Sequence, residues 1–162
     1  DNPKLNCRLK GYENFSPKRI ILDKNLENDF NTFIYKSIKK NNTIIFHNSQ
    51  NFKKIKILKK KGAILCKIKL NKKKRFIIKN ILKKLFSLGI RSLLVEGGDK
   101  ITKNMLSKRL INQFYLFKSS KNLSKSKKHV IFTSTDILND YYKIKSKISS
   151  DLAKDKITIY IR

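Results

Sequence analysis

Short apolar runs that alternate with amphipathic helical stretches place the strongest constraint on the fold of this 162-residue chain. The period of the apolar residues predicts strands at Arg19–Leu22, Thr43–His47, Ile64–Leu70 and Ser92–Val95. It predicts a helix after each of the last three strands, at 51–61, 77–88 and 99–110, with glycines ending the first two. Alternation of strand and helix predicts a parallel sheet covered by helices.

The last third of the sequence predicts strands only. They lie at Gln113–Phe117, Val130–Phe132, Tyr142–Ser149 and Lys156–Ile161, with a Ser/Lys-rich loop at 118–128. Strands in succession pair antiparallel. We therefore predict one α/β domain with a mostly parallel central sheet and antiparallel C-terminal strands.

The charge of the chain invites a nucleic-acid interpretation. Lys and Arg number 40 against 11 Asp and Glu, a formal net charge of +29. However, Lys greatly outnumbers Arg, the residue that reads bases and phosphates best. Ile and Asn are abundant too, and all three have AT-rich codons. Two interpretations stay open: coding bias over a solvated surface, and selected binding of a polyanion.

Other features exclude several classes of protein. No apolar run approaches the length of a membrane span, and the first residues do not resemble a secretory signal. Cys7 and Cys66 are too few for a disulfide framework or a zinc cluster, which favours a cytoplasmic setting. The isolated His47 and His129 are interpreted as structural or solvated.

The aromatic residues Phe114, Tyr115 and Phe117 lie at strand spacing. We interpret them as core residues and not as a platform for stacking bases.

One stretch joins a strand candidate, two glycines and the start of a helix. Ser92–Val95 is followed by Glu96-Gly97-Gly98 and then by the helix from Asp99. Ligands of α/β sheets bind beyond the carboxyl ends of strands, and the first turn of a helix favours phosphate. We expect Glu96 to project into such a crevice as a hydrogen-bond acceptor. A plain turn with a solvated glutamate is the alternative.

Three motifs stand in an order that is typical of one enzyme family. They are Asp1-Asn2-Pro3-Lys4-Leu5-Asn6-Cys7-Arg8, then Arg19-Ile20-Ile21-Leu22-Asp23, then Glu96-Gly97-Gly98 before a helix. In these motifs the sequence resembles the C-terminal reductase domain of the bifunctional riboflavin-biosynthesis deaminase/reductase, the RibD family. The resemblance is good up to about residue 117 and faint beyond it.

The resemblance implies a dihydrofolate-reductase-like three-layer sandwich. It implies NADPH-dependent reduction of the ribose of 5-amino-6-(5-phosphoribosylamino)uracil to a ribityl chain. Leu5, Arg8 and Glu96 match substrate contacts. Cofactor contacts are matched by Asp1, Gly98, Asp99, Lys100, Ile101, Thr102, Lys103 and Asn104. No proton donor is assigned and no metal site is expected in this chain.

The sequence departs from the family pattern at several places. Asp99 stands where a small or neutral residue is usual, and a carboxylate beside a pyrophosphate is unfavourable unless it caps the helix. Lys24 replaces a serine near the cofactor. The family's Asp-Glu-Leu and Ala-Pro-Lys-Leu-Leu-Gly stretch is replaced by 112–114 and 118–128. We therefore expect the C-terminal part of the site to depart from the family pattern.

The resemblance also implies that residues 1–162 form a reductase domain that is incomplete at its N-terminus. The zinc deaminase domain and the first reductase strand of the family are not in this sequence, so we expect this piece to be inactive alone. Zinc belongs only to that deaminase domain.

Two alternatives to this function remain. The first is a Lys-rich nucleic-acid-binding module with steeply salt-dependent affinity. The second is a dihydrofolate-reductase-like enzyme that acts on another pterin or pyrimidine. The expected partner is a phosphorylated small molecule, with no membrane, and a homodimer is left open.

Overall fold

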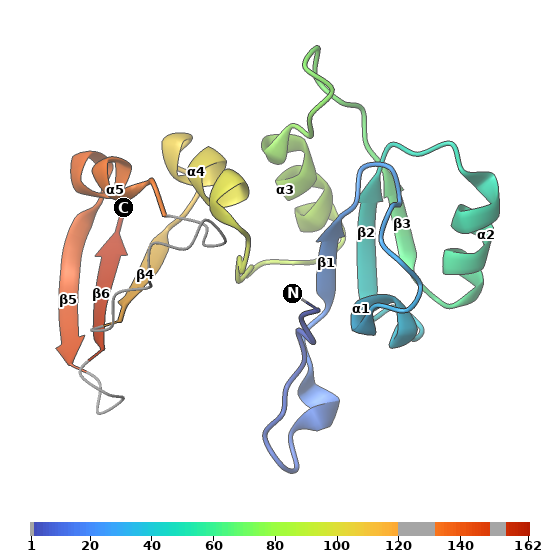
Figure 1. Cartoon of the computed structure of the whole chain (residues 1–162), viewed down its shortest axis with the longest axis horizontal. Helices are drawn as coiled ribbons and strands as arrows, with labels where there is room; N and C mark the ends of the chain where they lie inside the picture. Colours follow the sequence, from blue (N-terminus) through green and yellow to red (C-terminus); the bar gives the residue numbers. More distant parts are fainter. Residues whose placement is uncertain (1, 120–131, 150–154) are drawn as a thin grey trace, which may run out of the picture. The chain divides into compact units, whose positions relative to one another are not determined.

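The computed structural model describes residues 2–119, 132–149 and 155–162, and the chain divides into two compact units (Figure 1). Unit 1 spans Asp1–Arg91 and unit 2 spans Ser92–Arg162. Each unit has a three-stranded sheet, parallel in the first and antiparallel in the second. The predicted α/β class, with parallel strands first and antiparallel strands last, is confirmed.

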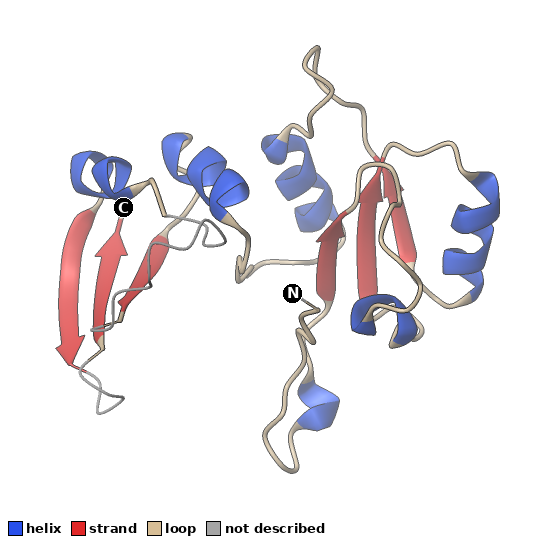
Figure 2. Ribbon diagram, viewed as in Figure 1, coloured by secondary structure: helices blue, strands red, loops and turns tan. Residues whose placement is uncertain are grey.

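Unit 1 is a parallel sheet of order β1-β2-β3 with helices between and after its strands (Figure 2). Its strands are β1 (Arg19–Leu22), β2 (Thr43–His47) and β3 (Ile64–Lys67). Its helical elements are η1 (Glu13–Phe15), α1 (Phe33–Lys36), α2 (Phe52–Lys60) and α3 (Ile78–Ser87). All five residues of β2 are buried, as is typical of a central strand covered on both faces.

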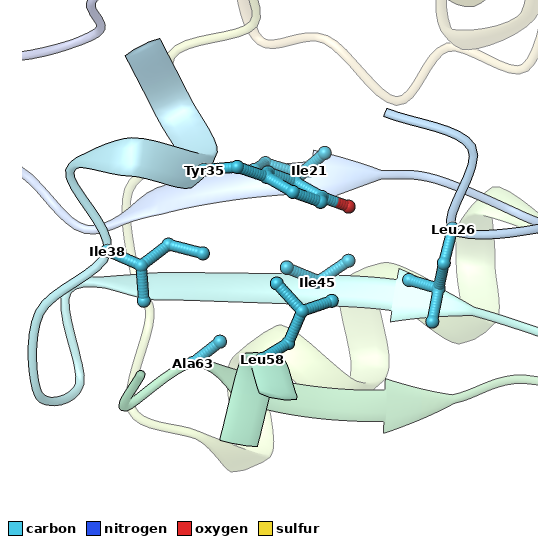
Figure 3. Close-up of a cluster of buried hydrophobic side chains, with 7 residues drawn as sticks. All are labelled: Ile21, Leu26, Tyr35, Ile38, Ile45, Leu58 and Ala63. Carbon is cyan, nitrogen blue, oxygen red and sulfur yellow. The ribbon is translucent and has the colours of Figure 1, made fainter. Parts of the chain in front are cut away.

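One face of this sheet carries the main core of unit 1. Strand register places Ile21 opposite Ile45, and Ile45 opposite Leu65. Figure 3 shows side chains from α1, α2 and the loops converging on this face. The buried cluster consists of Ile21, Leu26, Tyr35, Ile38, Ile45, Leu58 and Ala63.

The opposite face is closed as well. Along β2, Ile44 and Phe46 point to this opposite face, and both are almost fully buried. Helix α3 has a buried stripe of Ile78, Ile81 and Leu85 at helical spacing. Burial raises the pKa of Cys66 on β3, and the charge of Lys84 on α3 acts in the opposite direction.

Polar residues at the start of β1 and directly after it stabilise the fold. The Arg19 guanidinium donates to the hydroxyls of Ser37 (2.6 Å) and Thr43 (2.8 Å) and to the Ser37 carbonyl (3.0 Å). These partners are neutral, so burial lowers the pKa of Arg19 without a compensating carboxylate.

At the other end of β1, Asp23 holds the following loop. Its carboxylate accepts the N–H groups of Glu27 (2.8 Å) and Asn28 (3.0 Å) and the hydroxyl of Tyr35 (2.8 Å). Burial and the adjacent Asp23 both raise the pKa of Tyr35. The second sequence motif therefore begins and ends with residues that have structural roles.

A close backbone approach follows α2. Gly62 has φ +98°, and its carbonyl accepts the N–H of Asn41 at 3.0 Å. A Cβ atom at Gly62 would lie 2.8 Å from both the Cα and N atoms of Lys40. Glycine is therefore required here by conformation and by space.

Unit 2 is an antiparallel sheet of order β4-β6-β5. Its strands are β4 (Gln113–Lys118), β5 (Lys143–Ser149) and β6 (Lys156–Ile161), and its helices are α4 (Asp99–Ser107) and α5 (Thr135–Tyr141). A core joins both helices to one face of the sheet. Its buried members are Leu106, Leu138, Tyr142 and Tyr160.

Several predicted elements need correction. Helix α4 ends at Ser107, because Arg109 has φ +52° and leaves the helical conformation. The last third contains a helix, α5, whose two turns rich in Asn and Asp resemble a loop in sequence. Phe132 lies outside any strand, and residues 130–131 and 120–128 of the predicted strand and loop are outside the described residues. The short helix α1 was not predicted.

We expect His47 to make the stability of unit 1 sensitive to acid. His47 is 3% exposed, and its Nδ1 atom is buried with no hydrogen-bond partner among the described residues. Burial, then the charges of Lys67 and Lys59, lower its pKa in the fold, whereas Ser49 and Asp23 oppose that shift. The unfolded chain therefore binds a proton that the folded chain resists, and stability falls as pH drops through about 6.5.

Urea unfolding at pH 7.5 and pH 5.5 checks this expectation. The free energy of unfolding should fall over this interval in the unaltered protein and fall less in His47→Gln. An equal fall in both proteins would contradict it.

Candidate functional site

The Glu-Gly-Gly turn leads directly into α4 in unit 2. Gly98 is the N-cap residue and makes no side-chain cap hydrogen bond, so the helix begins without the usual side-chain acceptor. A Cβ atom added to Gly98 would meet nothing within 4 Å, whereas one added to Gly97 would lie 1.9 Å from Cγ2 of Ile101. Gly97 therefore allows the turn to pack against α4, and Gly98 leaves the backbone open to a ligand.

The predicted buried strand before this turn is wrong. Residues 92–95 form no strand, Leu93 and Leu94 are 37% and 80% exposed, and the stretch begins unit 2. A strand requires a hydrogen-bonded neighbour, and no strand of the described part of the chain pairs with these residues. Glu96 is exposed in this irregular segment and does not stand at the end of a strand.

Asp99 is tied to the segment before α5. Its Oδ1 atom accepts the backbone N–H of Thr133 at 3.2 Å, and its Oδ2 atom accepts the Thr133 hydroxyl at 3.2 Å. Its position in the first turn of α4 also suits a negative charge. The expectation that Asp99 caps its own helix is replaced by this tie to Thr133.

The other predicted cofactor residues follow along α4. Ile101 and Thr102 are half-buried, and the Thr102 hydroxyl donates to the Gly97 carbonyl at 3.3 Å. Lys100 and Lys103 are exposed. The Oδ1 atom of Asn104 is buried with no partner among the described residues.

An open hollow of about 270 Å³ lies beside the turn. Sequence reasoning did not find it, because its walls come from three separate segments. Its lining residues are Val95, Gly97, Asp99, Thr102, Phe114, Tyr115 and Phe132.

The aromatic residues of β4 differ from the core expectation. Phe114 packs against the core of unit 2, but Tyr115 and Phe117 are 48% and 68% exposed. Alternate residues of a strand face opposite sides of the sheet, so the two exposed rings share the side away from the helices. The alternation of Tyr115 and Phe117 with Phe114 and Leu116 in the sequence could have predicted that these two rings are exposed.

The remaining predicted site residues lie in unit 1. Asp1 is outside the described residues, Leu5 is half-buried at φ +48°, and Arg8 is exposed. Their segment is anchored because the Asn2 side chain accepts the N–H of Phe33 at 2.8 Å and Cys7 donates to the Ser16 hydroxyl at 3.1 Å.

Lys24 follows β1 and is half-buried. Its carbonyl accepts the N–H of Asn48 at 2.8 Å, which joins the chain after β1 to the chain after β2. The substitution of serine by lysine thus lies at the carboxyl edge of the sheet, where ligands of such sheets bind.

Comparison with solved structures assigns the fold. RibD of Acinetobacter baumannii matches 99% of this chain and 43% of its own chain, with a TM-score of 0.73 and 20% identity. A pyrimidine reductase-like protein of Corynebacterium diphtheriae matches 90% of this chain and 61% of its own, with a TM-score of 0.64 and 15% identity. The fold is thus the dihydrofolate-reductase-like α/β fold of this class of reductases.

Sequence comparison assigns the family. The chain belongs to the RibD C-terminal domain family, whose model matches residues 1–157. The riboflavin biosynthesis protein RibD of Aquifex aeolicus is 34% identical over 117 residues, and that of Actinobacillus pleuropneumoniae is 29% identical over 119. Each match covers 72% of this chain, and the chain spans 31% and 30% of these relatives. The comparisons lend no support to the nucleic-acid-binding alternative.

Proposed function

We propose that this chain is part of an NADPH-dependent reductase that converts the ribose of 5-amino-6-(5-phosphoribosylamino)uracil to a ribityl chain in riboflavin biosynthesis. Membership of the RibD C-terminal domain family over residues 1–157 carries this proposal. The Glu-Gly-Gly turn at the start of α4 supports the proposal, because its open backbone suits a bound cofactor.

The residues of this turn fit a dinucleotide. Gly98 leaves its backbone open, and the start of α4 attracts a phosphate group, whereas the Asp99 carboxylate in the same turn repels it. Lys100 and Lys103 add exposed positive charge on the same helix. NADPH, when bound, supplies the hydride, and the protein's task is to orient the reacting groups and exclude water.

Arg8 is the residue we propose for the substrate phosphate. Its guanidinium is permanently charged and presents a fork of donors that matches phosphate oxygens. The segment that carries it is held at Asn2 and Cys7, so Arg8 lies on an anchored part of unit 1. Leu5 and Glu96 complete the proposed substrate contacts, and Asp1 is proposed with the cofactor residues.

We further propose that residues 1–162 contribute to a single reductase domain acting in the cytoplasm. Both cysteines are free, in agreement with a reducing setting. None of the helices in the described ranges combines the length and apolar character needed to cross a membrane. A substrate panel on the complete protein distinguishes this pyrimidine from another pterin or pyrimidine.

NADPH oxidation by the complete protein tests the function, and Arg8→Gln tests the phosphate contact. We expect the KM for the phosphorylated substrate to rise about tenfold or more, because a charge-assisted bidentate contact is lost. The KM for the dephosphorylated substrate should change little. Lys10→Gln removes a neighbouring exposed charge and is the control. Equal effects of both variants, or none on the KM of the phosphorylated substrate, would contradict this role for Arg8.

A further inference from the structure

The hollow beside the Glu-Gly-Gly turn has room for one ring. Its volume of about 270 Å³ lies just below the range of roughly 300–1,000 Å³ for small-molecule pockets. A whole dinucleotide does not fit in such a space, but a single planar heterocycle does. The hollow lies entirely within unit 2, so its walls do not depend on the placement of the two units.

Aromatic side chains form one wall of the hollow. The rings of Phe114 and Phe132 stack with their centroids 5.8 Å apart and their planes 17° apart. Tyr115, the next residue of β4, borders the hollow, but its ring lies on the other side of the sheet and is not part of this wall. Flat aromatic surfaces of this kind favour a planar ring, because a stacked ring buries its apolar faces at small entropic cost.

Asp99 supplies the one carboxylate among the seven lining residues. An ionised carboxylate only accepts hydrogen bonds, and its two oxygens offer about four acceptor sites. Thr133 uses some of them, at the rather long distances of 3.2 to 3.4 Å. The remaining sites suit the N–H groups of a ligand, and the negative charge disfavours a phosphate in the same space.

We propose that this hollow binds a planar heterocycle that donates a hydrogen bond to Asp99 and stacks on the aromatic wall. This inference rests on the proposed function and specifies its site: Asp99 determines which ring enters. Two reactants offer the required chemistry, namely the carboxamide-bearing dihydronicotinamide of NADPH and the aminopyrimidine of the substrate. The phosphates of either ligand lie outside the hollow.

Calorimetric titration of the complete protein tests the hydrogen bond to Asp99 in two arms. The first arm compares NADPH with its reduced 3-acetylpyridine analogue, which has no amide N–H. The second compares 5-amino-6-ribitylaminouracil with its ring-N-methylated analogue. In one arm we expect the donor-bearing ligand to bind about fivefold or more tightly, a preference that Asp99→Leu reduces to about twofold or less. The arm that responds identifies the ring.

Two aromatic residues provide a matched test of stacking. Phe132 lines the hollow and its ring stacks on Phe114, whereas Phe117 is exposed on the side of β4 away from the helices and does not line the hollow. Phe132→Leu should weaken the responding ligand about fivefold, and Phe117→Leu should leave its affinity unchanged. Asp136→Asn removes an exposed acid from the first turn of α5 and serves as the control for charge.

The outcomes separate this inference from the proposed function. A protein that oxidises NADPH normally but shows no donor preference in either arm, or keeps its preference in Asp99→Leu, overturns the inference alone. Asp99→Asn, which keeps the shape of the side chain, should show an intermediate preference if the leucine variant unfolds. A protein that binds neither ligand overturns both proposals.

Discussion

Replacing Gly97 with alanine is expected to reduce the affinity of the complete protein for NADPH about tenfold or more. The new Cβ atom would lie 1.9 Å from Cγ2 and 3.3 Å from Cβ of Ile101. Ile101 is branched at Cβ and cannot withdraw by bending a flexible end, so the turn or the first turn of α4 has to move. A displacement of this size at a positioning element costs binding and catalysis strongly. Titration with NADPH and thermal unfolding measure the two effects.

The neighbouring glycine is the matched control. Gly98→Ala places a Cβ atom where nothing lies within 4 Å and at an ordinary φ of −67°. We expect it to leave the thermal midpoint nearly unchanged. The double variant Gly97→Ala/Ile101→Ala should recover much of the thermal midpoint, because it removes the obstructing methyl group. Gly97→Ala with normal affinity and stability would show that the turn does not need this close approach.

Gly62→Ala is expected to destabilise the protein by about 2–5 kcal/mol. A residue with a Cβ atom pays roughly 1–2 kcal/mol for the left-handed region, and overpacking adds about 1–3 kcal/mol. The obstructing atoms are the Cα and N atoms of Lys40, 2.8 Å away, and backbone atoms cannot swing aside. The change also threatens the hydrogen bond from Asn41 to Gly62. Urea unfolding measures the loss.

Gly89→Ala measures the backbone strain alone, which is one of the two contributions to the destabilisation expected for Gly62→Ala. Gly89 has φ +83° and nothing within 4 Å of the added Cβ atom. Its substitution should cost about 1–2 kcal/mol, the strain alone. If both variants lost the same stability, the contact with Lys40 would contribute nothing and our explanation of Gly62 would fail.

The sequence predicted the parts of the fold whose signals are local. The apolar runs of β1 and β2 and the helical stripe of α3 lie where their periods placed them, since each buries its own face. The alternation of Ile157, Ile159 and Ile161 likewise identified β6. These elements carry their signal in neighbouring residues.

Residues 92–95 show where local reasoning fails. Their composition is that of a buried strand, but strand formation depends on a partner, and the described structure pairs them with none. The converse holds for α5, whose Leu138 is fully buried although its helix is too short and polar to predict. In both cases tertiary contacts decide what propensity does not.

Only one part of the candidate site could be predicted from the sequence. The glycine turn and the start of α4 were predicted because Gly97, Gly98 and Asp99 are contiguous. The hollow was not, because Phe114 and Phe132 reach it from segments far along the chain. Thr133, the partner of Asp99, is 34 residues away and gave no signal.

The carboxylate of Asp23 has a consequence for ligand binding. A loop that becomes ordered only when a ligand arrives weakens the affinity for that ligand. Here the loop after β1 already donates two amides to a buried acid that also accepts the hydroxyl of Tyr35. The conformational entropy of this loop is therefore given up during folding. A nucleotide that meets this edge encounters a preorganised surface, and its binding energy is free to act elsewhere in the site.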